Sequence, residues 1–284
     1  MRAALAVFTG LLLAALAACS PLRIIDDLTP KDTFKRVEGV AYGDDPRQKL
    51  DVYLPLKPLP ATPVVVFFYG GSWNSGDRGD YRFVGEALAS RGIIAVVADY
   101  RLYPQVRYPS FLEDGAKAVA WTHRHIGQYG GDAHRLFLMG HSSGAYNASM
   151  LALDPRLLNA VGLAPSDIRG WIGLAGPYDF LPIENKDVKP VFFFPNSPPD
   201  SQPINHVAKG APPALLIASS SDNLVNPQRN TAGLAQKLRD NGVPVEEFYY
   251  SRTNHQTLVA TLSKPLKWLA PVIEDVTGFI QSTQ

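Results

Sequence analysis

The stretch Arg135-Leu-Phe-Leu-Met-Gly-His-Ser-Ser-Gly-Ala145 decides the fold class. A short apolar run ends in Gly140-His-Ser-Ser-Gly144, and a segment that can form a helix follows. This is a G-x-S-x-G pattern between a strand and a helix, the context in which a sharp turn projects the central serine above a sheet. That serine is Ser142, because it alone has glycine two residues before it and two residues after it. Such a turn strains the backbone and leaves room only for small neighbours, so we expect Ser142 to be a nucleophile.

Apolar runs and helical segments alternate along the rest of the chain. Strands alternating with helices imply an α/β fold with a mostly parallel central sheet and helices on both of its faces. The patterns predict strands at 48–54, 63–69, 93–98, 136–139, 171–175, 214–219 and 245–250. They predict helices at 81–91, 111–129, 145–153, 231–240 and 258–279, the last interrupted at Pro265 and Pro271.

The segment 176–210 does not fit this alternation. It is rich in proline and aromatic residues, as in Phe192-Phe-Phe-Pro195. We interpret it as a small cap-like insertion over the carboxyl edge of the sheet, where sheets of this kind bind ligands. A long structural loop is the alternative, and the sequence does not decide between the two.

Composition bounds the class of protein. The chain has 284 residues, 46% of them hydrophobic, which is enough for one large core, and we expect one domain over 34–284. The formal net charge is +1, and like charges do not form blocks, so we expect no nucleic-acid partner.

The N-terminus has the features of a secretory signal. A positive start, Met1-Arg2, precedes an apolar stretch that is too short for a comfortable transmembrane helix. The stretch ends in Leu16-Ala-Ala-Cys19, which holds the only cysteine of the chain and resembles the lipobox of bacterial lipoproteins.

That resemblance implies a signal peptide over 1–18, lipid attachment at Cys19 and a tether over 19–33. Several acyl chains on Cys19 would hold the protein on a membrane of the bacterial cell envelope. Ser20 resembles the pattern for sorting to the outer membrane, on its periplasmic side. An ordinary signal peptide with a chance cysteine is the alternative.

A serine nucleophile needs a base, normally a histidine that a carboxylate orients. Of the six histidines, His255 is the best placed, because it follows the last predicted strand, where a loop can reach Ser142. Asp222 follows the strand 214–219 and is the preferred carboxylate. Asp179 is the main competitor, and we interpret Asp99, which precedes the serine, as structural.

Acyl chemistry also needs hydrogen-bond donors for the negative oxygen that develops on the substrate carbonyl. Phe68-Tyr-Gly-Gly-Ser-Trp73 follows a buried strand and corresponds to the glycine-rich loop that forms one side of such an oxyanion hole. We expect the amides of Gly71 and of Ser72 or Gly70 to donate, together with the amide of Ser143. A plain glycine turn is the alternative.

Together these motifs resemble the α/β-hydrolase superfamily, in the branch of hormone-sensitive-lipase-like carboxylesterases, prenylcysteine methylesterase-like proteins and kynurenine formamidases. The resemblance covers roughly residues 35 to 280 and includes the order serine, aspartate, histidine. It also includes Asp99-Tyr-Arg-Leu-Tyr-Pro104, which is similar to a segment that packs the active-site face in that branch.

One position departs from the family pattern. Where Tyr69 stands, the family usually has a histidine that supports the oxyanion loop through hydrogen bonds and is not the catalytic base. Tyrosine keeps a hydroxyl that can hydrogen-bond but reaches differently. The departure bears on the geometry of the loop and not on the triad.

The resemblance and the residues together predict a lipid-anchored serine hydrolase that cleaves carboxylic esters, needs no metal or organic cofactor, and acts on a small-molecule ester or amide. An aryl-formamide hydrolase is the alternative within catalysis, because the same triad serves amides. A non-catalytic binding module on a hydrolase scaffold is the alternative from another class. The sequence indicates neither the physiological substrate nor the oligomeric state.

Overall fold

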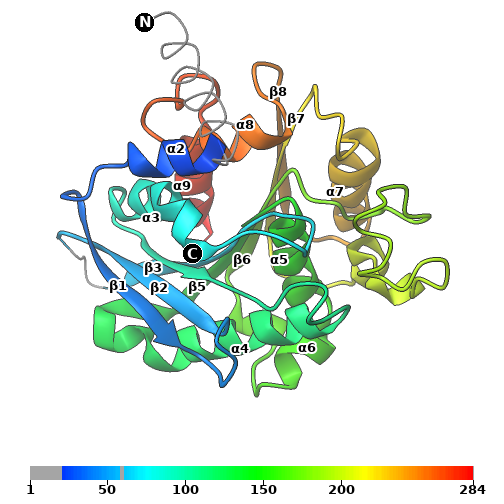
Figure 1. The fold of residues 1–284 in the computed structure, drawn as a ribbon, viewed down its shortest axis with the longest axis horizontal. Helices are drawn as coiled ribbons and strands as arrows, with labels where there is room; N and C mark the ends of the chain where they lie inside the picture. Colours follow the sequence, from blue (N-terminus) through cyan, green and yellow to red (C-terminus); the bar gives the residue numbers. More distant parts are fainter. Residues whose placement is uncertain (1–20, 58–60, 284) are drawn as a thin grey trace, which may run out of the picture.

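A computed structural model describes residues 21–57 and 61–283, whose strands form one eight-stranded sheet (Figure 1). The first two pairs across the sheet are antiparallel and all the others are parallel. The predicted mostly parallel sheet is therefore confirmed. In spatial order the strands are β1 (Phe34–Ala41), β2 (Lys49–Pro55), β4 (Ile94–Ala98), β3 (Thr62–Phe68), β5 (Gly131–His141), β6 (Gly170–Leu174), β7 (Ala214–Ser219) and β8 (Val245–Tyr250).

Helices cover both faces of the sheet, as the alternating pattern predicts. Figure 1 shows α3 and α9 together on one face and α4, α5 and α6 on the other. The α-helices are α2 (Pro21–Asp27), α3 (Arg82–Ala89), α4 (Ser110–His125), α5 (Ser143–Leu153), α6 (Pro155–Asn159), α7 (Gly233–Asp240), α8 (His255–Ala260) and α9 (Val272–Ser282). Shorter helical turns are η1 (Arg78–Tyr81), η2 (Ile126–Tyr129), η3 (Pro165–Asp167), η4 (Pro199–Ser201), η5 (Pro203–His206) and the π-helical η6 (Gln228–Ala232).

The central strands form the middle of the core. All five residues of β4 and all six of β7 are buried, and β3 is buried along nearly its whole length. Strands covered on both faces show continuous apolar runs rather than alternation, which explains why these runs could be identified in the sequence.

Three elements, α2, β1 and α6, are not predicted by the sequence, and α2 lies within the predicted tether. β1 is an edge strand that carries polar residues and whose pairing with β2 shifts in register between Val37 and Val40, so it lacks a regular pattern. α6 is short, but its start has a recognisable signal: the Asp154 side chain accepts the amide of Arg156, and Pro155 occupies the first turn.

The helix predicted over 258–279 is corrected. α8 begins three residues earlier, where the Asn254 side chain accepts the amide of Thr257 and caps it, and ends at Ala260. Residues 261–271 contain no α-helix, and α9 begins only at Val272, directly after Pro271. The two prolines therefore separate two helices rather than interrupt one.

The signal peptide predicted over 1–18 and Cys19 lie outside the described residues. Within the predicted tether, the Asp26 carboxylate accepts the amide of Phe83 at 3.3 Å and pairs with Arg82 at 3.2 Å. The end of the α2 segment thus packs on the domain, and a tether would be shorter on its domain side than 19–33. No described helix is both long and apolar enough to cross a membrane.

Candidate active site

The turn between β5 and α5 holds Ser142 in a strained backbone conformation. Ser142 has φ 55° and ψ −123°, a region that few non-glycine residues occupy, and its amide donates to the Leu174 carbonyl at 2.8 Å. A Cβ atom on Gly144 would lie 2.0 Å from the Phe68 carbonyl oxygen, and one on Gly140 would lie 2.1 Å from the Gly144 carbonyl oxygen. Both glycines therefore have the steric role that the motif predicts.

The structure brings Ser142, Asp222 and His255 together in one hydrogen-bonded chain. The Nε2 atom of His255 is 2.8 Å from the Ser142 hydroxyl, and its Nδ1 atom is 2.7 Å from a carboxylate oxygen of Asp222. Asp222 follows β7 and His255 is the first residue of α8, after β8. All three residues thus stand at the carboxyl ends of parallel strands, where this fold gathers its functional groups.

The surroundings of the Asp222 carboxylate favour its ionised form. Burial alone would raise its pKa, but the hydrogen bond and charge of His255 and the amides of Val225 and Leu224 outweigh burial and hold the pKa below its ordinary value. Both amides donate to the same oxygen at 2.9 Å. The other oxygen is left for His255.

The two other aspartates that the sequence offered have different partners. Asp179 forms an ion pair with Arg229 at 3.0 Å, and Asp99 accepts hydrogen bonds from Tyr69 and Arg78. Neither is bonded to His255.

His141, next to the nucleophile, contacts the backbone of His255. Its Nε2 atom lies 2.8 Å from the backbone carbonyl oxygen of His255, and the two rings are 5.1 Å apart. Burial, together with the nearby His255, lowers the pKa of His141 to about 3. The neutral ring must then carry its proton on Nε2, because a carbonyl oxygen only accepts. No local sequence signal reveals this contact between residues 114 positions apart.

The predicted oxyanion loop makes a sharp turn after β3. Gly71 and Ser72 have φ values of 134° and 51°, and a Cβ on Gly71 would lie 2.2 Å from the Ser75 carbonyl oxygen. Ser72 and Ser143 line the same cavity as Ser142. Gly70 and Gly71 are not among the residues that line this cavity. Of the four predicted donors, Ser72 and Ser143 are therefore the ones at the cavity.

Tyr69 anchors this loop from below. Its fully buried hydroxyl accepts a hydrogen bond from Arg47 at 2.7 Å and donates to Asp99 at 2.8 Å. Arg47 also donates to the Gly76 carbonyl at 2.8 Å, and the Tyr100 hydroxyl donates to the Tyr69 carbonyl at 2.8 Å. Tyrosine thus supports the loop through a buried charged network. The contribution of Arg47 cannot be inferred from the sequence.

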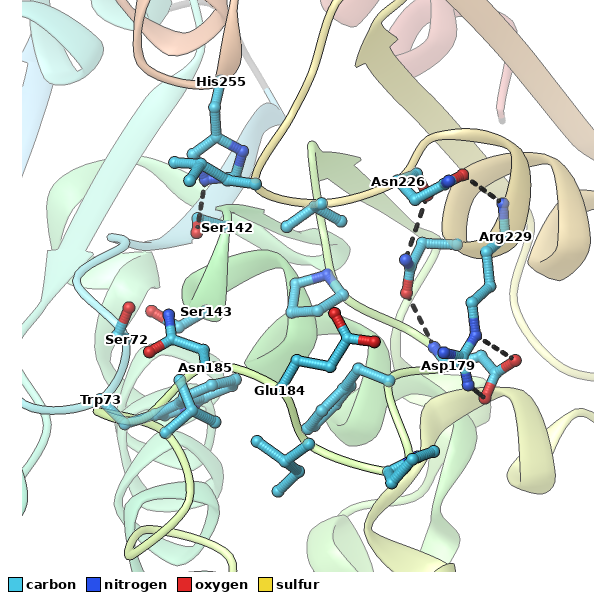
Figure 2. Close-up of a pocket in the computed structure, with 18 residues that line it drawn as sticks. Ser72, Trp73, Ser142, Ser143, Asp179, Glu184, Asn185, Asn226, Arg229 and His255 are labelled. Carbon is cyan, nitrogen blue, oxygen red and sulfur yellow. Dashed lines mark hydrogen bonds and ion pairs between the residues drawn. The ribbon is translucent and has the colours of Figure 1, made fainter.

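The nucleophile opens into a cavity of about 350 Å³ (Figure 2). The segment 176–210 supplies much of the wall opposite the triad, including Phe180, Glu184 and Asn185. Arg229 and Asn230, before α7, complete that side. Sequence reasoning placed the insertion over this edge but identified none of these five residues.

The described residues contain no group of three or more histidine, cysteine, aspartate or glutamate side chains that could hold a metal ion. The hydrogen bonds from Ser142 through His255 to Asp222 suit proton transfer during attack on an acyl carbon.

Comparison with known proteins gives relatives over most of the chain. A probable isoprenylcysteine alpha-carbonyl methylesterase, ICMEL1 of Arabidopsis thaliana, is 28% identical over 265 residues, covering 85% of this chain and 55% of the relative. Esterase LipC of Mycobacterium tuberculosis is 29% identical over 222 residues, covering 70% of this chain and 54% of the relative. The chain thus spans about half the length of these curated relatives.

Solved structures show the same fold. Esterase B from Lactobacillus rhamnosis matches with a TM-score of 0.75 at 21% identity, over 99% of this chain and 98% of that one. EstE1, a carboxylesterase from a metagenomic library, matches with a TM-score of 0.73 at 18% identity, over 92% and 93%. A family model described as BD-FAE matches residues 50–238, more than half of the sequence. The chain therefore belongs to the BD-FAE family, and it has the α/β-hydrolase fold of these solved esterases.

Proposed function

We propose that the protein is a serine hydrolase that cleaves carboxylic esters through an acyl-enzyme intermediate. The observation that carries the proposal is the unbroken chain of hydrogen bonds from the Ser142 hydroxyl through His255 to Asp222, at 2.8 and 2.7 Å. The names of the relatives, which include several esterases, support the same conclusion.

The geometry assigns each residue a step. Asp222 is ionised and can only accept a hydrogen bond from Nδ1 of His255, so the proton of the neutral ring is on Nδ1 and Nε2 is free to act as a base. Nε2 takes the proton of the Ser142 hydroxyl as the serine oxygen attacks the substrate carbonyl carbon. His255 then gives that proton to the leaving alcohol, and Ser142 keeps the acyl group.

The oxyanion that forms during attack needs donors on the far side of the carbonyl carbon. We assign this role to the amides of Ser72 and Ser143, with Gly71 shaping the turn between β3 and Ser72. Removal of one such donor typically costs about 10²–10³-fold in rate. Water, activated by His255 in the same way, then attacks the acyl-enzyme and releases the acid.

The first test compares the protein without residues 1–19 with its Ser142→Ala variant on p-nitrophenyl acetate and butyrate. We expect hydrolysis by the parent and its loss in the variant, with unchanged circular dichroism. An inactive but folded parent would contradict the proposal and favour a binding module. N-formylkynurenine, assayed beside the esters, tests the aryl-formamide alternative, and a higher kcat/KM on it would replace the ester assignment.

We further propose that the protein is anchored by lipid on Cys19 to the bacterial cell envelope, at the periplasmic side of the outer membrane. The lipobox-like Leu16-Ala-Ala-Cys19 and Ser20 support this proposal. Detergent phase partitioning of the full chain and of Cys19→Ser tests it. A full chain that stays in the aqueous phase, like the variant, would contradict it.

A further inference from the structure

One carboxylate that lines the cavity has no hydrogen-bond or ion-pair partner among the described residues. It belongs to Glu184, an exposed residue of the insertion. Figure 2 shows its side chain between the Ser142–His255 pair and the Asp179–Arg229 pair. Glu184 and the nucleophile Ser142 thus line one and the same cavity.

Arg229 is the cation that could neutralise Glu184, but it is engaged elsewhere. Its guanidinium donates to both carboxylate oxygens of Asp179, each at 3.0 Å, and also to the Leu181 carbonyl. The hydrogen bonds to Asp179 come first among the influences that raise the pKa of Arg229, burial opposes them, and the charge of Glu184 adds to them. Arg229 is thus hydrogen-bonded and ion-paired to Asp179, whereas Glu184 acts on it through charge alone, without a hydrogen bond.

An aromatic wall stands in the same cavity. Phe180 is partly exposed there, and its ring stacks on Trp73 at a centroid distance of 6.1 Å. Aromatic faces attract cations through their quadrupole, and proteins use this attraction to recognise quaternary ammonium groups, which cannot donate hydrogen bonds. A carboxylate and an aromatic face in one partly enclosed cavity are the two elements that such a group prefers.

We propose that this cavity selects esters that carry a positively charged ammonium group, with Glu184 as its counter-ion and Phe180 as its aromatic contact. The proposal rests on the proposed esterase function and adds the class of substrate. Glu184→Gln removes the charge while keeping the size and hydrogen-bonding capacity of the side chain, so it separates recognition of a cation from recognition of a hydroxyl group.

The test uses two pairs of substrates matched in shape. Acetylthiocholine and S-(3,3-dimethylbutyl) thioacetate place the cation, or its carbon analogue, on the leaving group. The p-nitrophenyl esters of 4-(trimethylammonio)butyrate and 5,5-dimethylhexanoate place it on the acyl group. The quantity measured is the ratio of kcat/KM for the cationic member to kcat/KM for the neutral member.

In at least one pair, we expect Glu184→Gln to lower this ratio about threefold to fivefold, as for a partly exposed charge contact. Asp187→Asn is the matched control, since Asp187 is an exposed acidic residue of the same insertion that does not line the cavity. It makes the same change of net charge and should leave the ratio within a factor of about two.

The outcomes separate the two proposals. Hydrolysis of the neutral esters, with ratios that Glu184→Gln leaves unchanged in both pairs, would overturn the ammonium subsite and retain the esterase. An equal fall in Glu184→Gln and Asp187→Asn would overturn it as well, because the effect would be one of net charge. Absence of hydrolysis in every pair would overturn both proposals.

Discussion

Replacing Tyr69 by phenylalanine is the sharpest test of how the oxyanion loop is held. The Tyr69 hydroxyl is fully buried and makes two charge-assisted hydrogen bonds, from Arg47 at 2.7 Å and to Asp99 at 2.8 Å. Hydrogen bonds to charged groups contribute about 1.5–3 kcal/mol each, and a buried group left without its partner loses stability. Phenylalanine keeps the ring, which stacks on Tyr81 and Tyr100 at 5.5 and 4.9 Å, so only the hydroxyl is lost.

The loss of stability is limited because both partners of the Tyr69 hydroxyl keep other hydrogen bonds. Asp99 keeps Arg78, and Arg47 keeps the carbonyl oxygens of Gly76 and Tyr100. We therefore expect the free energy of unfolding to fall by about 2–3 kcal/mol rather than by the full sum of two bonds. For a domain of this size that corresponds to a drop in Tm of roughly 4–6 °C.

Tyr69→Phe should lose only part of its activity, because the oxyanion loop stays attached to the domain. The loop keeps the hydrogen bond from Arg47 to the Gly76 carbonyl, so its amides shift without being removed. We expect kcat on p-nitrophenyl butyrate to fall by less than the roughly 10²–10³-fold loss that follows removal of an oxyanion donor, with KM nearly unchanged.

Urea unfolding followed by circular dichroism measures the loss of stability. Tyr129→Phe is the control, because Tyr129 is partly exposed and no hydrogen bond joins its hydroxyl to another described residue. Its unfolding free energy should stay within about 0.5 kcal/mol of wild type. A loss in Tyr69→Phe no larger than that of the control would refute the view that the Arg47–Tyr69–Asp99 network holds the loop.

Two further predictions concern the triad and its support. Asp222→Asn should lower kcat about 10⁴-fold with little change in KM, because an amide no longer holds the proton of His255 on Nδ1; a steady-state loss below tenfold would show that another group orients the base. Burial and the nearby His255 lower the pKa of His141 from 6.5 to about 3 in the folded protein. Between pH 6.5 and about pH 3, His141 is therefore protonated in the unfolded chain and neutral in the folded one. Stability from this group is complete above pH 6.5 and is lost as the pH falls, by up to about 1.4 kcal/mol per pH unit. In urea titrations at pH 6.5, 5.5 and 4.5, the stability lead of wild type over His141→Gln should shrink; a lead independent of pH would contradict the argument.

The sequence predicts the features that depend on continuously buried strands and on contacts between residues close in the chain. β7 and β8 have the predicted bounds, since each apolar or alternating run ends at a turn. The elbow could be predicted because Gly140 and Gly144 are required by contacts within a few residues and with the adjacent strand. Asp222 and His255 could be selected because a parallel sheet brings every strand's carboxyl end to one edge.

What could not be predicted depends on contacts between distant segments. Arg47 reaches Tyr69 and Gly76 through its side chain alone, and no local pattern marks it. The sequence places His255 in a loop, whereas the structure has it as the first residue of α8, for which Asn254 and Thr257 carry the capping signal. The cavity residues Glu184 and Arg229 lie outside the predicted strands, where polar side chains usually indicate only solvent exposure.

The insertion is hydrogen-bonded at its start to η6 and near its far end to α5, the helix that follows the nucleophile, and these contacts limit how it can move. The Asn230 side chain accepts the amides of Tyr178 and Asp179, at 2.7 and 2.9 Å, and so fixes its first turn. From α5, which begins directly after Ser142, the buried Tyr146 hydroxyl donates to the Ser201 carbonyl at 2.7 Å near the far end. A segment held at both ends by buried hydrogen bonds is costly to displace, because each bond would leave a buried polar group unpaired. The wall that carries Glu184 should therefore keep its position relative to Ser142 when substrate binds, and selection by charge then acts on the ground state and the transition state alike.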